Sequence, residues 1–437
     1  MKIENLNTLS KAKYYRITAR CRQDIYAQMR GVAASVIEDI RKNGDGALIK
    51  YVRKYDKVTL RPGNLVVSKQ EIRQAYKALD GSKALLAAIR RMRENVRLFC
   101  RKEYEKINKG WKYEFKKGYF AGQVLRPLDT VGIYVPGGRG AFYPSSAVMG
   151  IVPAKIAGVR EIIVATPPGR NGEISDIVLV AADLAGADVI IKAGGIQAIG
   201  AMAVGTETVP RVDKIAGPGN VYVCAAKLYV QARNYASIDF VAGPSELLVI
   251  ADDTAEPGYI ASDMIAQAEH GKDSSAVLVT TSLRVAERVS EEIEKRAESS
   301  ERKIFIEKSL KDYGAILVAK NIKEAIGFAN EFAPEHLELM TKKPEGLLKH
   351  IKNAGSIFLG AYTPVAAGDY ISGTNHILPT SGSARFSCGV NVETFLKKPT
   401  FQKFSKDALG RVKGAVVRLS DAENLPAHGR SIEERFG

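Results

Sequence analysis

The chain has five histidines, and two of them directly follow a glutamate: Glu269-His270 in AQAEHGKD and Glu335-His336 in FAPEHLEL. An imidazole changes protonation near neutral pH and also binds metal ions, so a histidine beside a carboxylate suits proton transfer or metal ligation. The alternative for each pair taken alone is a structural histidine beside a solvated acid. Together the two pairs make an enzyme the leading interpretation.

Residues near these pairs could complete a site. Gln267 lies three residues before His270, so on a helix both side chains reach one face and can converge on one ion or ligand. Asp369 stands near glycines in AAGDYISGTNH, where it either points into a cleft or caps a turn. In the same segment, His376 could be a metal ligand, a substrate contact or a hydrogen-bonding loop residue.

The cysteines limit which metal sites are possible. They lie far apart in the sequence and form no CxxC pair: Cys21, Cys100, Cys224 and Cys388. This spacing argues against a disulfide framework and against a thiolate zinc site. Any metal would therefore be held by nitrogen and oxygen atoms.

The elements that would position these residues follow an alternating pattern. From about residue 130, short β-branched runs alternate with segments of helix length, which predicts βα units on a mostly parallel sheet. Three glycine-rich turns follow such runs, in VPGGRGAFYPSS, AGGIQAIGAM and AGPGNVYVCAAK, and turns of this kind at helix N-termini suit phosphate or diphosphate. None has the GxGxxG spacing, so ordinary tight turns are an equal alternative. A second α/β stretch begins at IDFVAGPSELLVIADD.

Charge is unevenly distributed along the chain, whose net charge is +16. Residues 1–120 hold 29 of the 64 Lys and Arg residues but only 12 of the 48 Asp and Glu residues. The basic residues are interleaved with apolar ones in amphipathic helical patterns, so we interpret them as a solvated face and expect no nucleic-acid partner. No apolar run is long enough for a membrane span or a signal peptide, and we expect a cytoplasmic protein.

The last 45 or so residues, from about Asn391, are polar and helical in pattern. A polar terminus would ordinarily fray. His428 in this tail is therefore either part of a dispensable end or a residue delivered into a site elsewhere.

Taken together, these segments closely resemble the histidinol dehydrogenase family from about residue 30 to 430. The resemblance rests on nine blocks in order: VGIYVPGG, YPSSAVMGIVPAKIAGV, GGIQAIGAMAVGT, VDKIAGPGNVYV, IDFVAGPSELLVIAD, QAEHGKDS, APEHLEL, GDYISGTNHILPT and AENLPAH. It implies an α/β fold with two incomplete Rossmann-like domains. We expect an N-terminal segment at 1–27, a discontinuous main domain at 28–134 and 245–390, an inserted NAD-binding domain at 135–244, and a C-terminal helical tail at 391–437.

The resemblance also implies a metal site and substrate contacts. One zinc ion per subunit would be bound by Gln267, His270, Asp369 and His428, an N/O set that fits a catalytic zinc without cysteine. The same four residues would contact the substrate, together with Ser245, His336 and Glu423. Val365 stands where some family members carry an acidic residue, which leaves the surroundings of Asp369 less well defined.

The activity implied by the resemblance is the last step of histidine biosynthesis, the NAD-dependent four-electron oxidation of L-histidinol to L-histidine through histidinal. His336 would act as the base in both oxidations, and Glu335 would activate the water that adds to the aldehyde. NAD would contact Tyr134, Gln197 and Asn220, one from each glycine-rich turn. The resemblance implies a homodimer, and we expect a shared active site. The alternative is a paralogous zinc- and NAD-dependent enzyme for another small alcohol, such as a sulfonated one.

Overall fold

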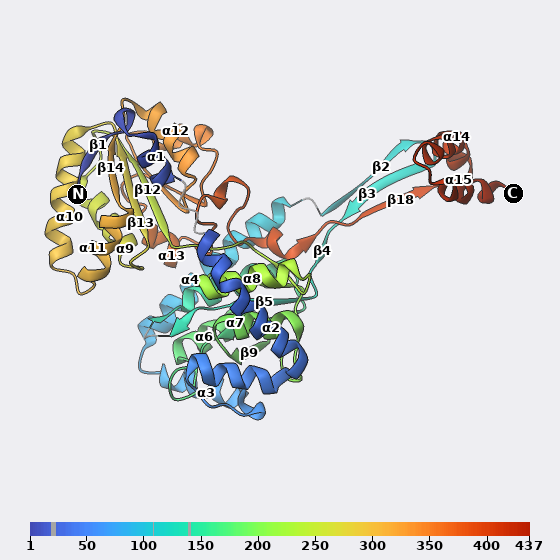
Figure 1. Ribbon diagram of the computed structural model, residues 1–437, viewed down its shortest axis with the longest axis horizontal. Coiled ribbons are helices and arrows are strands. Elements are labelled where there is room, and N and C mark those ends of the chain that lie inside the picture. Colours follow the sequence, from blue (N-terminus) through green and yellow to red (C-terminus); the bar gives the residue numbers. More distant parts are fainter. Residues whose placement is uncertain (19–22, 108, 139–140) are drawn as a thin grey trace.

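The computed structural model describes residues 1–18, 23–107, 109–138 and 141–437. Figure 1 shows two α/β units side by side and a long arm that leads away from them to the C-terminus. We call them the five-stranded unit, the six-stranded unit and the C-terminal arm. None of the helices in the described ranges is both long and apolar enough to cross a bilayer.

The five-stranded unit is built on a parallel sheet in the order β11-β10-β5-β8-β9. Its strands are short and largely buried, which explains their nearly continuous apolar sequences: β5 (Thr130–Tyr134), β8 (Glu161–Thr166), β9 (Val189–Lys192), β10 (Lys214–Ala216) and β11 (Ser237–Ile238). A short hairpin, β6 (Gly137–Gly138) and β7 (Ala141–Phe142), follows β5.

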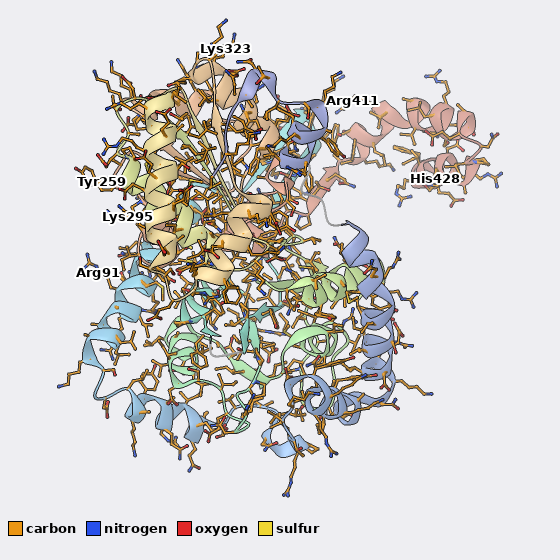
Figure 2. All side chains as sticks on the ribbon, turned by 60° about the vertical axis from the view of Figure 1, so that its left-hand side comes forward. Arg91, Tyr259, Lys295, Lys323, Arg411 and His428 are labelled. Carbon is orange, nitrogen blue, oxygen red and sulfur yellow. The ribbon has the colours of Figure 1, made fainter. Side chains whose placement is uncertain are left out.

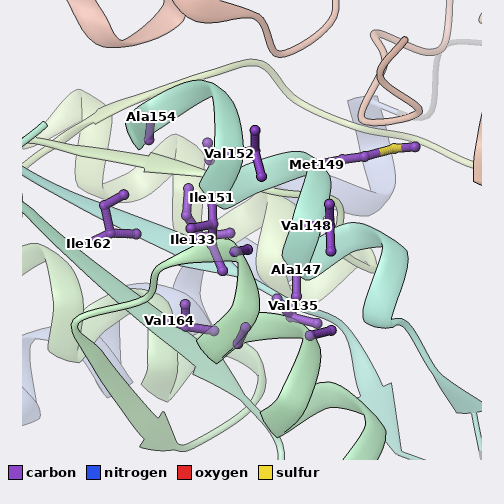
Figure 3. Close-up of a cluster of buried hydrophobic side chains, with 14 of the residues drawn as sticks. Ile133, Val135, Ala147, Val148, Met149, Ile151, Val152, Ala154, Ile162 and Val164 are labelled. Atoms are coloured by element: carbon purple, nitrogen blue, oxygen red, sulfur yellow. The ribbon is translucent and has the colours of Figure 1, made fainter. Parts of the chain in front are cut away.

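Helices cover both faces of this sheet. One core contains side chains of α3 (Lys69–Ala78), α4 (Lys83–Lys106), α5 (Pro144–Ala157) and α6 (Asp176–Ala185). Figure 3 shows Ile133 and Val135 packed beneath α5. The other core contains side chains of α2 (Gln23–Tyr51), α7 (Gly195–Val204) and α8 (Val221–Ala232).

The N-terminal helices belong to this unit, so the expected pairing of residues 28–134 with 245–390 is wrong. Helix α2 packs on α7 and α8, and α4 packs on α5. The reason is that α5 and α7 are apolar on nearly all sides and need a second layer of helices to exclude water. In the second core, a methyl group added to Gly200 of α7 would lie 3.0 Å from Ile37 of α2.

The six-stranded unit contains a second parallel sheet, in the order β1-β14-β13-β12-β15-β16. Its strands are β1 (Ile3–Asn5), β12 (Glu246–Ala251), β13 (Ser275–Thr280), β14 (Ala315–Val318), β15 (His336–Met340) and β16 (Ser356–Leu359). One core includes α9 (Pro257–Ala268), α10 (Leu283–Glu298), α11 (Lys303–Tyr313) and α13 (Val365–Tyr370), and the opposite core includes α12 (Ile322–Phe332) with α1 (Lys11–Thr18) packed against it.

Both sheets follow the strand order of a Rossmann fold without its sixth strand. When the strands of each sheet are numbered along the chain, with β1 set aside, both orders are 3-2-1-4-5. The expectation of two incomplete Rossmann-like α/β units is confirmed. The N-terminal strand β1 extends the six-stranded sheet at its edge by pairing with β14.

The C-terminal arm is ordered and does not fray. It consists of an antiparallel sheet, β2 (Gly110–Lys116), β3 (Tyr119–Val124) and β18 (Thr400–Phe404), followed by α14 (Lys406–Ala422) and α15 (Pro426–Glu433), which pack on each other. A small pair, β4 (Arg126–Pro127) and β17 (Leu396–Lys397), joins it to the five-stranded unit. Stacked rings support the sheet, with 4.1 Å between the centroids of Tyr119 and Phe404. Figure 1 shows α14 and α15 far from both units.

Candidate active site

The candidate site lies where the segment after α13 crosses from one unit to the other. Asn95 of α4 donates a hydrogen bond to the carbonyl of Ile371 at 2.7 Å. Asn375 donates to the carbonyl of Met149 in α5, also at 2.7 Å. His376 Nε2 lies 3.0 Å from the hydroxyl of Ser146 in α5. His376 is thus a hydrogen-bonding loop residue that fixes the junction of the two units.

Glu335 and His336 lie at the start of β15, beside the start of β12. The carboxylate of Glu335 accepts a hydrogen bond from the Glu246 amide at 2.8 Å, and Nδ1 of His336 lies 3.1 Å from the Glu246 carbonyl oxygen. Because a carbonyl can only accept, Nδ1 carries the proton and Nε2 has a free lone pair. Nε2 is buried and has no hydrogen-bond partner among the described residues. This is the tautomer that a general base requires.

Asp369, in the last turn of α13, faces this imidazole, with its Oδ1 3.9 Å from Nε2 of His336. Burial raises the pKa of the Asp369 carboxyl to about 7. The pKa of His336 is lowered to about 3, mainly by burial and also by the charges of His270 and His376. Both shifts favour the neutral side chains.

Gln267 and His270 lie at the C-terminal end of α9. The Gln267 side chain is buried, and its Nε2 has no hydrogen-bond partner among the described residues. The charge of His270 acts on both His336 and His376, which places it in the same cluster. The surrounding protein also lowers the pKa of His270. A helix C-terminus carries partial negative charge, which favours a bound cation.

The topology explains why these residues meet. In most doubly wound sheets, ligands bind at the carboxyl ends of the strands. Here Glu335 and His336 lie at the amino end of β15, and Ser245 directly precedes β12. Helices α9 and α13 return across the sheet, so their C-terminal ends, which carry Gln267 and Asp369, arrive at the same edge.

Glu423 and His428 are not brought to this edge within one chain. Glu423 follows α14, His428 lies in α15, and both are exposed on the C-terminal arm. Figure 2 shows His428 well away from the two units. Within the described residues, no three His, Cys, Asp or Glu side chains are grouped closely enough to hold a metal ion. Of the four expected ligands, Gln267, His270 and Asp369 lie in the six-stranded unit, whereas His428 lies on the C-terminal arm of the same chain.

The three residues expected to contact a dinucleotide line one cleft of about 1050 Å³ at the carboxyl edge of the five-stranded sheet. Tyr134 ends β5, and its hydroxyl accepts a hydrogen bond from the Gly195 amide at 3.1 Å. Asn220 caps α8 by accepting hydrogen bonds from the amides of Tyr222 and Val223 at 3.0 and 3.2 Å. The cleft lies at the point where the strand order reverses, between β5 and β10.

Glycine is required where β5 and β10 meet beneath this cleft. Gly217 has a φ of +124°, and a Cβ there would lie 2.1 Å from the carbonyl oxygen of Tyr134. The backbone of the AGPGN turn can therefore approach the adjacent strand more closely than any other residue would allow. Gly217 allows this close approach without the usual GxGxxG spacing.

Two polar residues were missed by the sequence interpretation, Asp56 at the cleft of the five-stranded unit and Glu246 beside His336 in the six-stranded unit. Asp56 lies shortly after the end of α2. Its Oδ2 accepts a 2.9 Å hydrogen bond from the Gln197 side chain and a 3.3 Å hydrogen bond from the Gly194 amide. Burial raises the pKa of this carboxyl. Glu246 was missed because its carboxylate, buried at the start of β12, reads as part of an apolar strand. No local motif marks either residue.

Two doubly wound α/β units, one with a cleft at the carboxyl ends of its strands and the other with a buried histidine whose Nε2 is unprotonated, fit the class of α/β dehydrogenases. The family model for histidinol dehydrogenase matches residues 19–436. The histidinol dehydrogenase of Methanosarcina mazei is 47% identical over 437 residues, which is 100% of this chain and 98% of that protein. The chain belongs to the histidinol dehydrogenase family and is an oxidoreductase.

Other relatives agree along the whole length. The histidinol dehydrogenase of Caldanaerobacter subterraneus subsp. tengcongensis is 49% identical over 403 residues, covering 92% of this chain and 91% of that protein. The crystal structure of histidinol dehydrogenase from Elizabethkingia anophelis has a TM-score of 0.89 and 37% identity, and the match covers 100% of this chain and 97% of that chain. The similarity therefore extends over both units and the arm.

Proposed function

We propose that this protein oxidises L-histidinol to L-histidine through histidinal, the last step of histidine biosynthesis, with NAD and zinc. The observation that carries the proposal is the buried imidazole of His336, which follows Glu335 in the sequence. Its Nε2 is an unprotonated acceptor that lies 3.9 Å from Oδ1 of Asp369. Family membership supports the substrate and the reaction.

The residues at the site fit a zinc ion. The Gln267 amide is buried with its Nε2 unpartnered among the described residues, and the Asp369 carboxyl is largely buried, which raises its pKa. An amide oxygen, a carboxylate and imidazoles form an N/O set that suits zinc when cysteine is absent. Gln267, His270 and Asp369 would hold the ion, with His428 as the fourth ligand. Bound there, zinc would orient the substrate through the imidazole and amino nitrogens of histidinol.

Glu335 and His336 would carry out two different proton transfers. In each oxidation, Nε2 of His336 takes a hydroxyl proton, first from the alcohol and then from the aldehyde hydrate. Between them, Glu335 removes a proton from the water that adds to the aldehyde carbon. One alcohol and one water thus yield a carboxylate, two hydrides and three protons. NAD supplies the hydride acceptor, and the cleft with Tyr134, Gln197 and Asn220 is the site that we assign to it.

We also propose that two chains form a dimer with shared active sites. The arm carries α14 and α15, and with them Glu423 and His428, away from the two α/β units of its own chain (Figures 1 and 2). A second copy related by two-fold symmetry would supply the arm of one chain to the site of the other. The carboxylate of Glu423 would then meet the amino group of histidinol.

Measuring the stoichiometry tests the reaction. Purified protein with histidinol and excess NAD should give two NADH and one histidine for each histidinol, with little free histidinal, because one site holds both the base and the water-activating group. NADH is followed by absorbance, and histidine and histidinal by chromatography. One NADH per histidinol with accumulating histidinal would contradict the role of Glu335. Turnover of a sulfonated diol in preference to histidinol would instead favour a paralogous dehydrogenase.

Removing the metal should abolish activity. Exhaustive chelation followed by gel filtration should lower kcat by on the order of 10²-fold or more, and stoichiometric Zn²⁺ should restore it, because substrate orientation depends on the ion. Metal content and kcat are measured on the same samples. Mg²⁺ added in place of Zn²⁺ is the control and should restore nothing, since it prefers oxygen ligands. Full turnover by metal-free protein would overturn the zinc assignment.

A further inference from the structure

A pair of carboxyl groups lies in the core of the six-stranded unit and has no part in the proton transfers described above. Glu338 of β15 is 1% exposed, and its Oε1 accepts a hydrogen bond from the Val365 amide, at the start of α13, at 3.1 Å. Its other oxygen, Oε2, is also buried, and no N–H or hydroxyl group among the described residues donates a hydrogen bond to it. The side chain of Asp263, from α9, is hydrogen-bonded to Glu338.

Two carboxyl groups can form a hydrogen bond only through a proton that one of them carries. One of the two carboxyl groups therefore carries a proton that it donates to the other, while Oε1 of Glu338 also accepts from the Val365 amide. Burial and the charge of Asp263 raise the pKa of Glu338 well above its usual value. Burial raises the pKa of Asp263 to about 6, while the hydrogen bond from Glu338 acts in the opposite direction. One proton is thus held between the two side chains near neutral pH.

Asp263, Glu338 and Val365 each lie on the same helix or strand as one residue of the candidate site, and only two to four positions away from it. Asp263 lies one helical turn before Gln267 in α9, and Val365 lies one turn before Asp369 in α13, so each pair shares a helix face. Glu338 lies two residues after His336 in β15, on the same face of the strand. A single chain of hydrogen bonds therefore joins the elements that carry two ligands and the base.

Stability does not explain why positions 263 and 338 carry acids instead of apolar residues. Burying two carboxyl groups costs solvation free energy, and well-packed apolar side chains at such positions are often neutral or more stable. The surrounding core of α9 and α13 is otherwise apolar, with Ile260, Met264 and Phe358 nearby. Hydrogen bonds differ from apolar contacts in being directional, so they fix how α9 and α13 rotate and slide against β15.

We propose that the hydrogen-bonded pair Asp263–Glu338 is a positioning pair, which holds α9, β15 and α13 so that Gln267, His336 and Asp369 converge on the metal and substrate. The inference rests on the zinc site of the proposed function. Neither acid touches substrate or metal in this arrangement. Supporting residues of this kind typically contribute 10- to 100-fold to metal affinity.

The test compares two replacements of Glu338 in the full-length protein. Glu338→Gln keeps an acceptor for Val365 and a donor for Asp263, so zinc affinity and kcat should stay within about threefold of the wild type. Glu338→Leu has a similar volume but no hydrogen bonds, so zinc affinity should fall roughly 10- to 100-fold and kcat should fall with it. Zinc affinity is measured by competition with a chromogenic chelator, and the midpoint of thermal unfolding is measured on the zinc-free protein.

The zinc-free measurement separates positioning from a merely structural role. If the pair positions ligands, Glu338→Leu leaves the unfolding midpoint of the zinc-free protein equal to or above that of the wild type while zinc binding weakens. Asp263→Leu, which removes the bond from the helix side, should have the same effect and replaces Glu338→Leu if that variant does not fold. If the folded Leu variants bind zinc as tightly as the wild type, the positioning role is wrong and the proposed metal site stands. No zinc binding by the wild type overturns the proposed metal site and this inference with it.

Discussion

His336→Ala is expected to lower kcat for histidinol oxidation by on the order of 10²- to 10⁴-fold, the usual range for loss of a general base. Glu335→Gln should slow the oxidation of added alcohol less, because only His336 takes a proton in both oxidations. With Glu335→Gln, the loss should appear after the aldehyde stage. The structural reason is that Nε2 of His336 is the buried acceptor beside Asp369, while Glu335 is held by the Glu246 amide.

The comparison needs both substrates and a control for the site. Single-turnover rates with histidinol report the first oxidation, and rates with histidinal report water addition and the second oxidation. Zinc content should be unchanged in both variants, since neither residue is a proposed ligand. His350→Ala serves as a control, because that histidine lies on a short helix on the surface and should have wild-type rates. Equal losses for His336→Ala and Glu335→Gln with histidinol would contradict the division of roles.

Much of the fold follows from local sequence signals. The runs that became β5, β8 and β9 are apolar and β-branched, as strands buried on both faces must be. Glu335 directly precedes His336, the first residue of β15, and His270 follows Gln267 by three residues in the turn that ends α9. These parts were predictable because short-range geometry decides them.

The remaining parts depend on contacts between distant segments. The N-terminal helices pack on the five-stranded unit because α5 and α7 need cover, and no property of residues 28–107 alone indicates that partner. The pair Asp263 and Glu338 is also hidden, since a single acid in a helix or strand reads as a solvated residue until its burial is known. For the polar tail, the sequence left open a dispensable end or a segment that delivers His428 to a site elsewhere. The strands that hold the tail as an arm come from the distant segment of β2 and β3.

Mixing two inactive variants, His336→Ala and His428→Ala, is expected to restore about a quarter of wild-type activity. If each site takes Gln267, His270, Asp369, Glu335 and His336 from one chain and Glu423 and His428 from the other, a mixed dimer has one site with both lesions and one with neither. Random reassociation makes half of the dimers mixed, and half of their sites are intact. The position of His428 on an exposed arm, remote from its own site, is the physical basis for this result (Figure 2).

The exchange is carried out by mild denaturation and refolding of equal amounts of the two variants, with each variant refolded alone as the baseline. Activity is measured against refolded wild type. Zinc content should stay at the mean of the two variants, because each intact His428 still completes one metal site and mixing only changes which chain that site belongs to. A second mixture, His336→Ala with Asp369→Ala, is the matched control. His336 and Asp369 both come from the chain that supplies the main part of a site. Every site in a mixed dimer therefore keeps one of the two lesions, and no activity should return. Recovery in the control, or none in the first mixture, would show that the arm serves its own chain or that the ligand set is different.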